Sequence, residues 1–440
     1  MHVLFHNGAL LRPGAEVAEN GWLLVEGEKI SRLGTGPIPA DIPPDAERRD
    51  LDGGLLMPGL VNAHTHAAMT IFRGLADDKE LMDWLQNYIF PAESHLTADW
   101  VKWGTLLACA EMIRSGTTCF NDMYLFVNTV VAAAEQSGMR TVSGEVLYDF
   151  PSRSYGPLEK GYALMQEFCQ KWRGHPTIHA AVNAHAPYTC APEVLQKAHE
   201  IAAENDAMLH IHVAETEFEF NSIKEKYGAT PLQHLANLGI ADCRLMAAHM
   251  VWLSDAEMDL AAKNGVKVLH NPVSNLKLAS GIARVPEMLK RGIRVGLGTD
   301  GAASNNSLDM FEEMKAAACI HKWNSRDATA VSAEQAVIMA TDAAVLGLEK
   351  LTGSLEPGKA ADLIVVDFNT PHLRPCHNRV SQLVYAANGG DVRDTMVNGK
   401  WLMKDRRLLT LDEGKILREA DRVAAEIRAC IAKNPQTKGK

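Results

Sequence analysis

The sequence has few of the features that mark secreted or membrane-spanning proteins. Its eight cysteines are scattered, and the two that lie closest in sequence, Cys109 and Cys119, are ten residues apart. The absence of a CxxC pair argues against a disulfide framework and against a thiolate zinc site. No stretch of about 18 uninterrupted apolar residues occurs, so we expect no membrane-spanning helix.

The sequence also lacks an excess of basic residues. Its formal net charge is −10, and an acidic surface repels phosphate backbones, so we expect no nucleic-acid partner. The first residues lack the charged-then-apolar order of a signal peptide, and we expect a cytoplasmic protein that does not bind membranes. Hydrophobic residues make up 47% of the 440 positions. That is enough for one large core and a smaller companion, because single cores stop growing at roughly 250–300 residues.

Apolar runs alternate with helical patterns through the middle of the chain, which is typical of a parallel sheet. Eight such units predict an α/β fold with a (β/α)8 TIM-type barrel over residues 58–352. The eight runs are 55–66, 117–123, 140–147, 177–185, 207–215, 244–249, 266–271 and 293–300.

Both ends of the chain have β character and predict a second, smaller domain. Residues 1–57 show short strands and turns, and residues 353–440 return to this pattern, with a hairpin at 395–400. We expect the two segments to form one small β-sandwich domain. A charged amphipathic helix at about 412–433 closes the chain.

Histidines and one aspartate stand where the runs of the barrel end. The first run ends in His64 and His66, and the other ends carry His185, His212, His249, His270 and Asp300. Catalytic groups of such barrels lie at the carboxyl ends of the strands, so these side chains should converge on one mouth. A lone histidine at a strand end is more often a hydrogen-bonded structural residue, and only the joint arrangement indicates a site.

His64 and His66 are predicted to bind a metal ion. They lie two residues apart on a strand, so both side chains face the same side. The alternative is that the pair only fills the barrel interior, but buried imidazoles need partners. His212 would supply a third nitrogen and Asp300 an oxygen. His210 shares the face of His212, but His212 lies nearer the strand end and is preferred. This N/O set suits one Zn²⁺, with Fe²⁺ and Mn²⁺ as alternatives.

Two further residues predict hydrolytic chemistry. Glu215 follows His212 by three positions, where the strand ends, and is predicted to protonate the substrate as a general acid. His249 is predicted to polarise the attacking water and Asp300 to take its proton. The alternatives are an exposed loop carboxylate for Glu215 and a structural histidine for His249.

Several motifs resemble those of the amidohydrolase superfamily. They are PGLVNAHTH (58–66), HVAE (212–215), His249 and GTDG (298–301), and PGKAADL (357–363) resembles the superfamily's C-terminal signature. The resemblance covers about residues 1–405 and implies a metal-dependent hydrolase. Two-metal relatives use a carboxylated lysine on the fourth strand. The run 177–185 has no lysine, which implies a single metal.

Within this superfamily the chain is most similar to the 5-methylthioadenosine/S-adenosylhomocysteine deaminases. The similarity lies in MTIFRGLADD (69–78), GTTCFNDMY (116–124), HAPY (185–188) and NPVSNLKL (271–278). It implies that Glu93 binds the ribose hydroxyls and that His185 reaches the purine ring. It also implies that an arginine, with Arg153 as the candidate, binds the homocysteine carboxylate. The implied partner is a small nucleoside, and the implied assembly is a homo-oligomer.

Together these features predict a metal-dependent hydrolytic deaminase of 6-aminopurine nucleosides. The substrates would be 5′-methylthioadenosine, S-adenosylhomocysteine or adenosine, and the products ammonia and an inosine-type nucleoside. One alternative is a related hydrolase that acts on guanine, a pterin, cytosine or an s-triazine. A second is a non-catalytic metal-binding scaffold, against which Glu215 and His249 argue because neither has to bind the metal.

Overall fold

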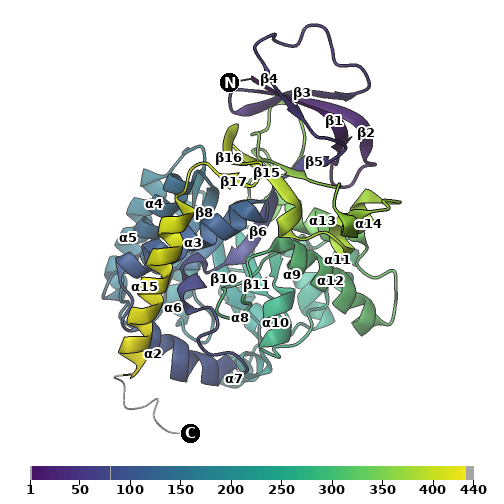
Figure 1. Cartoon of the computed structure of the whole chain (residues 1–440). Helices are drawn as coiled ribbons and strands as arrows, with labels where there is room; N and C mark the ends of the chain where they lie inside the picture. Colours follow the sequence, from purple (N-terminus) through teal and green to yellow (C-terminus); the bar gives the residue numbers. More distant parts are fainter. Residues whose placement is uncertain (1, 80, 433–440) are drawn as a thin grey trace.

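The computed structural model describes residues 2–79 and 81–432 as an α/β fold with two sheets (Figure 1). An eight-stranded parallel sheet forms a nearly closed barrel, and a nine-stranded mixed sheet takes its strands from both ends of the chain. The predicted fold class is therefore confirmed. The domain boundaries at residues 57 and 353 stay a prediction. Within the described ranges, no helix is long and apolar enough to cross a membrane.

The barrel strands follow one another in sequence order, each parallel to the next. They are β6 (Leu60–Thr65), β7 (Thr117–Tyr124), β8 (Arg140–Leu147), β9 (Ile178–Ala184), β10 (Met208–Val213), β11 (Leu245–His249), β12 (Lys267–His270) and β13 (Val295–Leu297). Where β13 ends, the Asp300 amide donates to the His64 carbonyl at 2.9 Å. This bond joins the last strand end to the first and brings two predicted site residues together.

Helices connect the strands and cover the outside of the barrel. The longer ones are α3 (Ala98–Arg114), α4 (Val127–Ser137), α5 (Leu158–Lys171), α6 (Pro192–Glu204), α7 (Glu217–Tyr227), α9 (Asp255–Asn264), α12 (Met310–Ser325) and α13 (Ala333–Thr341). Shorter pieces are η1 (Ala67–Phe72), α1 (Leu81–Trp84), η2 (Leu85–Ile89), α2 (Phe90–Glu93), α8 (Pro231–Asn237), α10 (Pro272–Lys277), α11 (Val285–Lys290) and η3 (Ala343–Leu346). Polar capping residues define where several of these helices begin. Ser254, for example, forms a capping box with Glu257 at the N-terminus of α9.

The prediction of one strand over 55–66 is wrong, because the strand is interrupted at Gly59. Residues Leu55–Pro58 form β5 of the mixed sheet, and β6 begins after the glycine. A Cβ on Gly59 would lie 2.1 Å from Thr118 side-chain atoms, closer than any real contact. Glycine is therefore required where the chain passes from one sheet to the other against β7.

The mixed sheet combines strands from both chain ends. Besides β5 it contains β1 (His2–Leu10), β2 (Ala18–Glu26), β3 (Lys29–Thr35), β4 (Glu47–Asp50), β14 (Leu363–Val366), β15 (Val392–Val397), β16 (Lys400–Lys404) and β17 (Arg407–Leu408). β15 and β16 form the predicted hairpin. Its two-residue turn, Asn398-Gly399, has positive φ at both positions, as a type I′ turn requires.

A buried ion pair ties the mixed sheet to the barrel. Asp362, in the PGKAADL segment, accepts a 2.7 Å bond from Arg140 Nε at the start of β8, and both side chains are fully buried. The same carboxylate accepts the Asn398 amide at 2.7 Å. Removing one partner would leave an uncompensated buried charge, so this motif holds the two sheets in a fixed relation.

The terminal helix α15 (Glu413–Ala432) packs along α3 on the outside of the barrel (Figure 1). The Trp100 indole donates to Glu426 at 2.8 Å across this contact. The helix was predicted at about 412–433, and residue 433 lies outside the described residues. The remaining short elements are η4 (Pro371–Leu373), α14 (Arg379–Tyr385) and η5 (Gly389–Asp391).

Candidate active site

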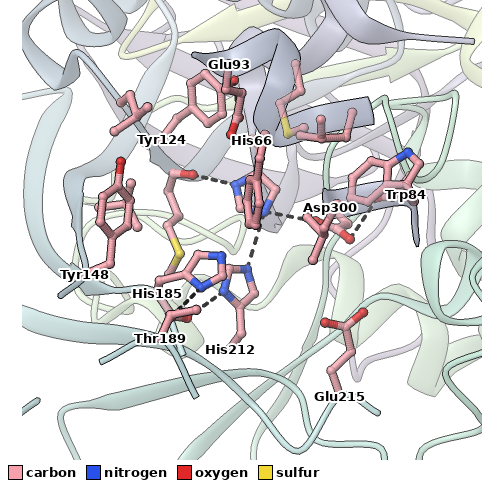
Figure 2. A pocket seen from close by; sticks show the side chains of 18 of the residues that line it. His66, Trp84, Glu93, Tyr124, Tyr148, His185, Thr189, His212, Glu215 and Asp300 are labelled. Atoms are coloured by element: carbon pink, nitrogen blue, oxygen red, sulfur yellow. Dashed lines mark hydrogen bonds and ion pairs between the residues drawn. The ribbon is translucent and has the colours of Figure 1, made fainter. Parts of the chain in front are cut away.

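The carboxyl ends of the barrel strands surround one pocket (Figure 2). Three residues at or just after these ends, Ala214, His249 and Asp300, have positive φ angles of 53°, 73° and 60°. This conformation is uncommon for residues other than glycine and costs about 1–3 kcal/mol per residue. Such strain persists where the surrounding structure enforces it, and here it coincides with the predicted functional residues.

His66 and His212 are oriented by backbone carbonyls. The Nδ1 of His66 donates to the Met123 carbonyl, and the Nδ1 of His212 donates to the His185 carbonyl at 2.7 Å. Each bond leaves Nε2 as the unprotonated nitrogen, which is the tautomer a metal ligand needs. The two Nε2 atoms lie 3.4 Å apart, so two lone pairs face each other unless a cation lies between them.

His64 lies beneath this pair and is completely buried. Its Nδ1 is 2.9 Å from His210 Nε2, while its own Nε2 has no hydrogen-bond partner among the described residues. An orphaned buried nitrogen aimed at the site fits a metal ligand. His210, the alternative to His212, therefore contacts the back of His64 and does not line the pocket.

Asp300 presents one carboxylate oxygen to the histidines. Ser274 and Ser304 donate to its Oδ2 at 2.7 and 2.9 Å. Its Oδ1 lies 3.3 Å from His64 Nε2 and 3.2 Å from His66 Nε2. The two serines fix the carboxylate so that Oδ1 faces the histidines.

These residues fit one divalent metal ion. The ligand atoms of His64, His66 and His212 all lie within 4.8 Å of one another, as do those of His64, His249 and Asp300. Nitrogen ligands about 2.0–2.1 Å from a tetrahedral zinc ion are about 3.3–3.4 Å apart, close to the separations seen here. Figure 2 shows His66, His212 and Asp300 directed toward one another.

Glu215 and His249 lie beside this cluster. His249 Nδ1 is 2.9 Å from Asn275 Oδ1, and its Nε2 is 3.8 Å from Glu215 Oε2. Ser280 donates to the other Glu215 oxygen at 3.3 Å. Burial raises the pKa of Glu215, which favours its protonated form, as a general acid requires.

Glu219 is a functional residue that the sequence reasoning missed. Its two carboxylate oxygens accept the backbone amides of Ala214 and Glu215, each at 2.9 Å. It therefore holds the left-handed turn that directs Glu215 into the pocket, and burial raises its pKa to about 8. The signal was the pattern T-x-x-E at 216–219, a helix-capping motif. Thr216 does cap α7 by accepting the Glu219 amide.

We expect the substitution Glu219→Gln to lower kcat by about tenfold while metal content and KM stay close to their normal values. An amide has only one acceptor oxygen, so one of the two backbone amides would lose its partner, at about 1–3 kcal/mol. Steady-state kinetics and metal analysis of the purified variant check this. A variant with unchanged kcat would show that Glu219 does not position Glu215.

Of the other residues predicted to bind substrate, two line the pocket and one does not. Glu93 and His185 line the pocket; Tyr124 donates to Glu93 at 2.7 Å, and His185 Nδ1 is 2.8 Å from Thr189. Arg153 does not line the pocket. Its exposed side chain donates from Nε to the Leu96 carbonyl at 3.3 Å.

The sequence and the fold are similar to those of known proteins. The model of the amidohydrolase family matches residues 55–402. The chain is 51% identical over 381 residues to a 5-methylthioadenosine/S-adenosylhomocysteine deaminase of Syntrophobacter fumaroxidans, covering 86% of this chain and 87% of that protein. It is 46% identical over 422 residues to a 5′-deoxyadenosine deaminase of Methanosarcina mazei, covering 95% and 96%.

Among solved structures, an adenosine deaminase from Xanthomonas campestris with bound zinc superposes with a TM-score of 0.94 at 37% identity. The match covers 97% of this chain and 98% of that one. The family match spans most of the chain, and the sequence relatives match over nearly their whole length. The chain belongs to the amidohydrolase family.

Proposed function

We propose that the protein is a metal-dependent hydrolytic deaminase of 6-aminopurine nucleosides that releases ammonia and an inosine-type product. The observation that carries the proposal is the pairing of Glu215 with His249, 3.8 Å apart, beside the cluster of His64, His66, His212 and Asp300. The names of the relatives, which include methylthioadenosine, deoxyadenosine and adenosine deaminases, support it.

His64, His66, His212 and Asp300 would hold the metal, for which we propose Zn²⁺. A divalent ion supplies Lewis-acid activation, which lowers the pKa of water from about 15.7 to about 7. Fe²⁺ and Mn²⁺ are the alternatives that the same donor set admits. A cytoplasmic location and a homo-oligomeric state stay predictions.

The roles of the protein's own groups follow from their positions. Asp300 Oδ1 takes the proton of the attacking water, and His249 Nε2 orients and polarises that water. Glu215 donates a proton to purine N1, which makes C6 a better electrophile. After water adds at C6, the proton held by Asp300 passes to the amino group, and the C–N bond breaks to release ammonia. The hydroxyl proton left at C6 returns to the Glu215 carboxylate as the C6 carbonyl forms, which restores both carboxyl groups. Glu93 binds the ribose hydroxyls, and His185 contacts the ring.

The experiment that tests the proposal measures ammonia release by the metal-loaded enzyme. The substrates are adenosine, 5′-deoxyadenosine and 5′-methylthioadenosine, compared with guanine, cytosine, a pterin and a chlorinated s-triazine. We expect turnover of the adenosine derivatives alone. Turnover of another ring would reassign the substrate within the family, and inactivity on every compound would favour a non-catalytic scaffold.

A further inference from the structure

The pocket has two chemically different sides. The polar side is formed by the predicted metal ligands together with Glu215 and His249. Figure 2 shows Glu93, Tyr124 and Tyr148 on the side of the histidines away from Glu215. The pocket encloses about 910 Å³, its open mouth included. With the purine at Glu215 and the ribose at Glu93, the 5′ substituent extends along the side beyond Glu93.

Aromatic and aliphatic side chains form the walls of this region. They come from the helical segment that ends at Glu93 and from the ends of β7 and β8: Leu85, Ile89, Phe90, Leu125, Tyr148 and Phe150. Tyr148 and Phe150 are stacked, with ring centroids 4.1 Å apart and planes inclined by 16°. Such walls suit an apolar group such as a methyl or alkylthio substituent.

No lysine or arginine is among the described residues that line the pocket. The described cations on neighbouring segments have other partners: Lys79 lies over the ring of Tyr88, and Arg73 pairs with Glu111. Arg153 is exposed and bonded to the Leu96 carbonyl, and Lys277 pairs with Asp77 at 2.6 Å. The carboxyl group beside the apolar wall is Glu93, which would repel a substrate carboxylate.

We propose that this pocket selects adenosine derivatives with an uncharged, apolar 5′ substituent and discriminates against the zwitterionic homocysteine chain of S-adenosylhomocysteine. The inference rests on the proposed deaminase function and narrows its substrate class. An α-carboxylate placed against these walls loses its water and gains no cation in return. A 5′-deoxy or 5′-alkylthio group carries no charge, so moving it from water into the pocket removes no ionic hydration and buries apolar surface.

The test compares three substrates of the metal-loaded enzyme: 5′-methylthioadenosine, 5′-butylthio-5′-deoxyadenosine and S-adenosylhomocysteine. The butylthio compound matches the homocysteine chain in length but carries no charge. We expect kcat/KM for the two neutral thioethers to agree within about tenfold, and the value for S-adenosylhomocysteine to be at least about 100-fold lower.

The possible results distinguish failure of the proposed substrate preference from failure of the proposed deaminase function. Comparable rates on all three substrates would overturn the inference and leave the deaminase function intact. Equally poor rates on both long substrates would also overturn it, because length and not charge would then decide. Inactivity on all three, and on adenosine, would contradict the proposed function itself.

A pair of variants at Phe150 provides a second measurement. Phe150 lines the pocket and is 47% exposed, so a long polar side chain fits there without entering the core. We expect Phe150→Arg to raise the ratio of kcat/KM for S-adenosylhomocysteine over methylthioadenosine by about tenfold or more, and the uncharged control Phe150→Gln to leave it unchanged. Equal ratios in the two variants would contradict the proposed role of charge.

Discussion

Replacing Glu215 with glutamine is expected to reduce kcat by about 10²–10⁴-fold, the usual contribution of a positioned general acid. Glutamine keeps the size of the side chain and can still bond Ser280 and face His249. It cannot donate a carboxylic proton to the purine ring. Because Glu215 does not belong to either group of potential ligands, the variant should keep its full metal content. Ammonia release and metal analysis of the same sample measure both quantities.

The matched control is Glu217→Gln, which makes the same chemical change two residues away on the exposed start of α7. This control should have normal kcat and metal content. A Glu215→Gln variant with a rate within tenfold of the wild type would exclude Glu215 as the proton donor. Loss of metal in that variant would instead assign Glu215 to the metal site.

The substitution Asp300→Asn is expected to lower kcat/KM by about 10³-fold or more, because it removes a metal ligand and the proton acceptor at once. Asp300 Oδ1 lies 3.3 and 3.2 Å from His64 and His66 Nε2, so an amide NH₂ in its place would also compete with the metal. We expect metal content to fall with activity. Asp327→Asn, on the exposed surface, serves as the control with the same loss of charge.

Adding excess zinc to the Asp300→Asn variant separates the two roles. If zinc restores metal content but not turnover, the carboxylate is needed as a base. If zinc restores both to wild-type levels, Asp300 is not the proton acceptor. In the wild type, removal of the metal by a chelator should abolish turnover, and reconstitution with Zn²⁺, Fe²⁺ or Mn²⁺ should rank the three metals by activity.

Most of the metal site could be predicted from the sequence because its signals are local. The two-residue period of a strand places His64 and His66 on one face, and the end of an apolar run marks the mouth of a barrel. The structure brings these two residues together with His212, Asp300, Glu215 and His249. The break at Gly59 was missed because apolar residues continue on both sides of it.

The supporting residues could not be predicted in the same way, because their partners are distant in sequence. Ser274, in α10, donates to Asp300 from 26 residues away, and His210 contacts His64 across 146 residues of sequence. The role of Arg153 stays a prediction. The position of this residue in a loop after the third strand fitted a substrate-binding role, but its side chain bonds the Leu96 carbonyl and stays outside the pocket.

The sequence by itself identified the candidates for metal ligands and proton donor, because residue type and position at a strand end indicate both. Only the tertiary structure decided how they are oriented. The carbonyls of Met123 and His185, 57 and 27 residues away, fix the tautomers of His66 and His212. The structure also decided that the described pocket lining contains no lysine or arginine. The physical reason is that orientation and charge environment depend on contacts between segments far apart in the chain, which a local pattern does not encode.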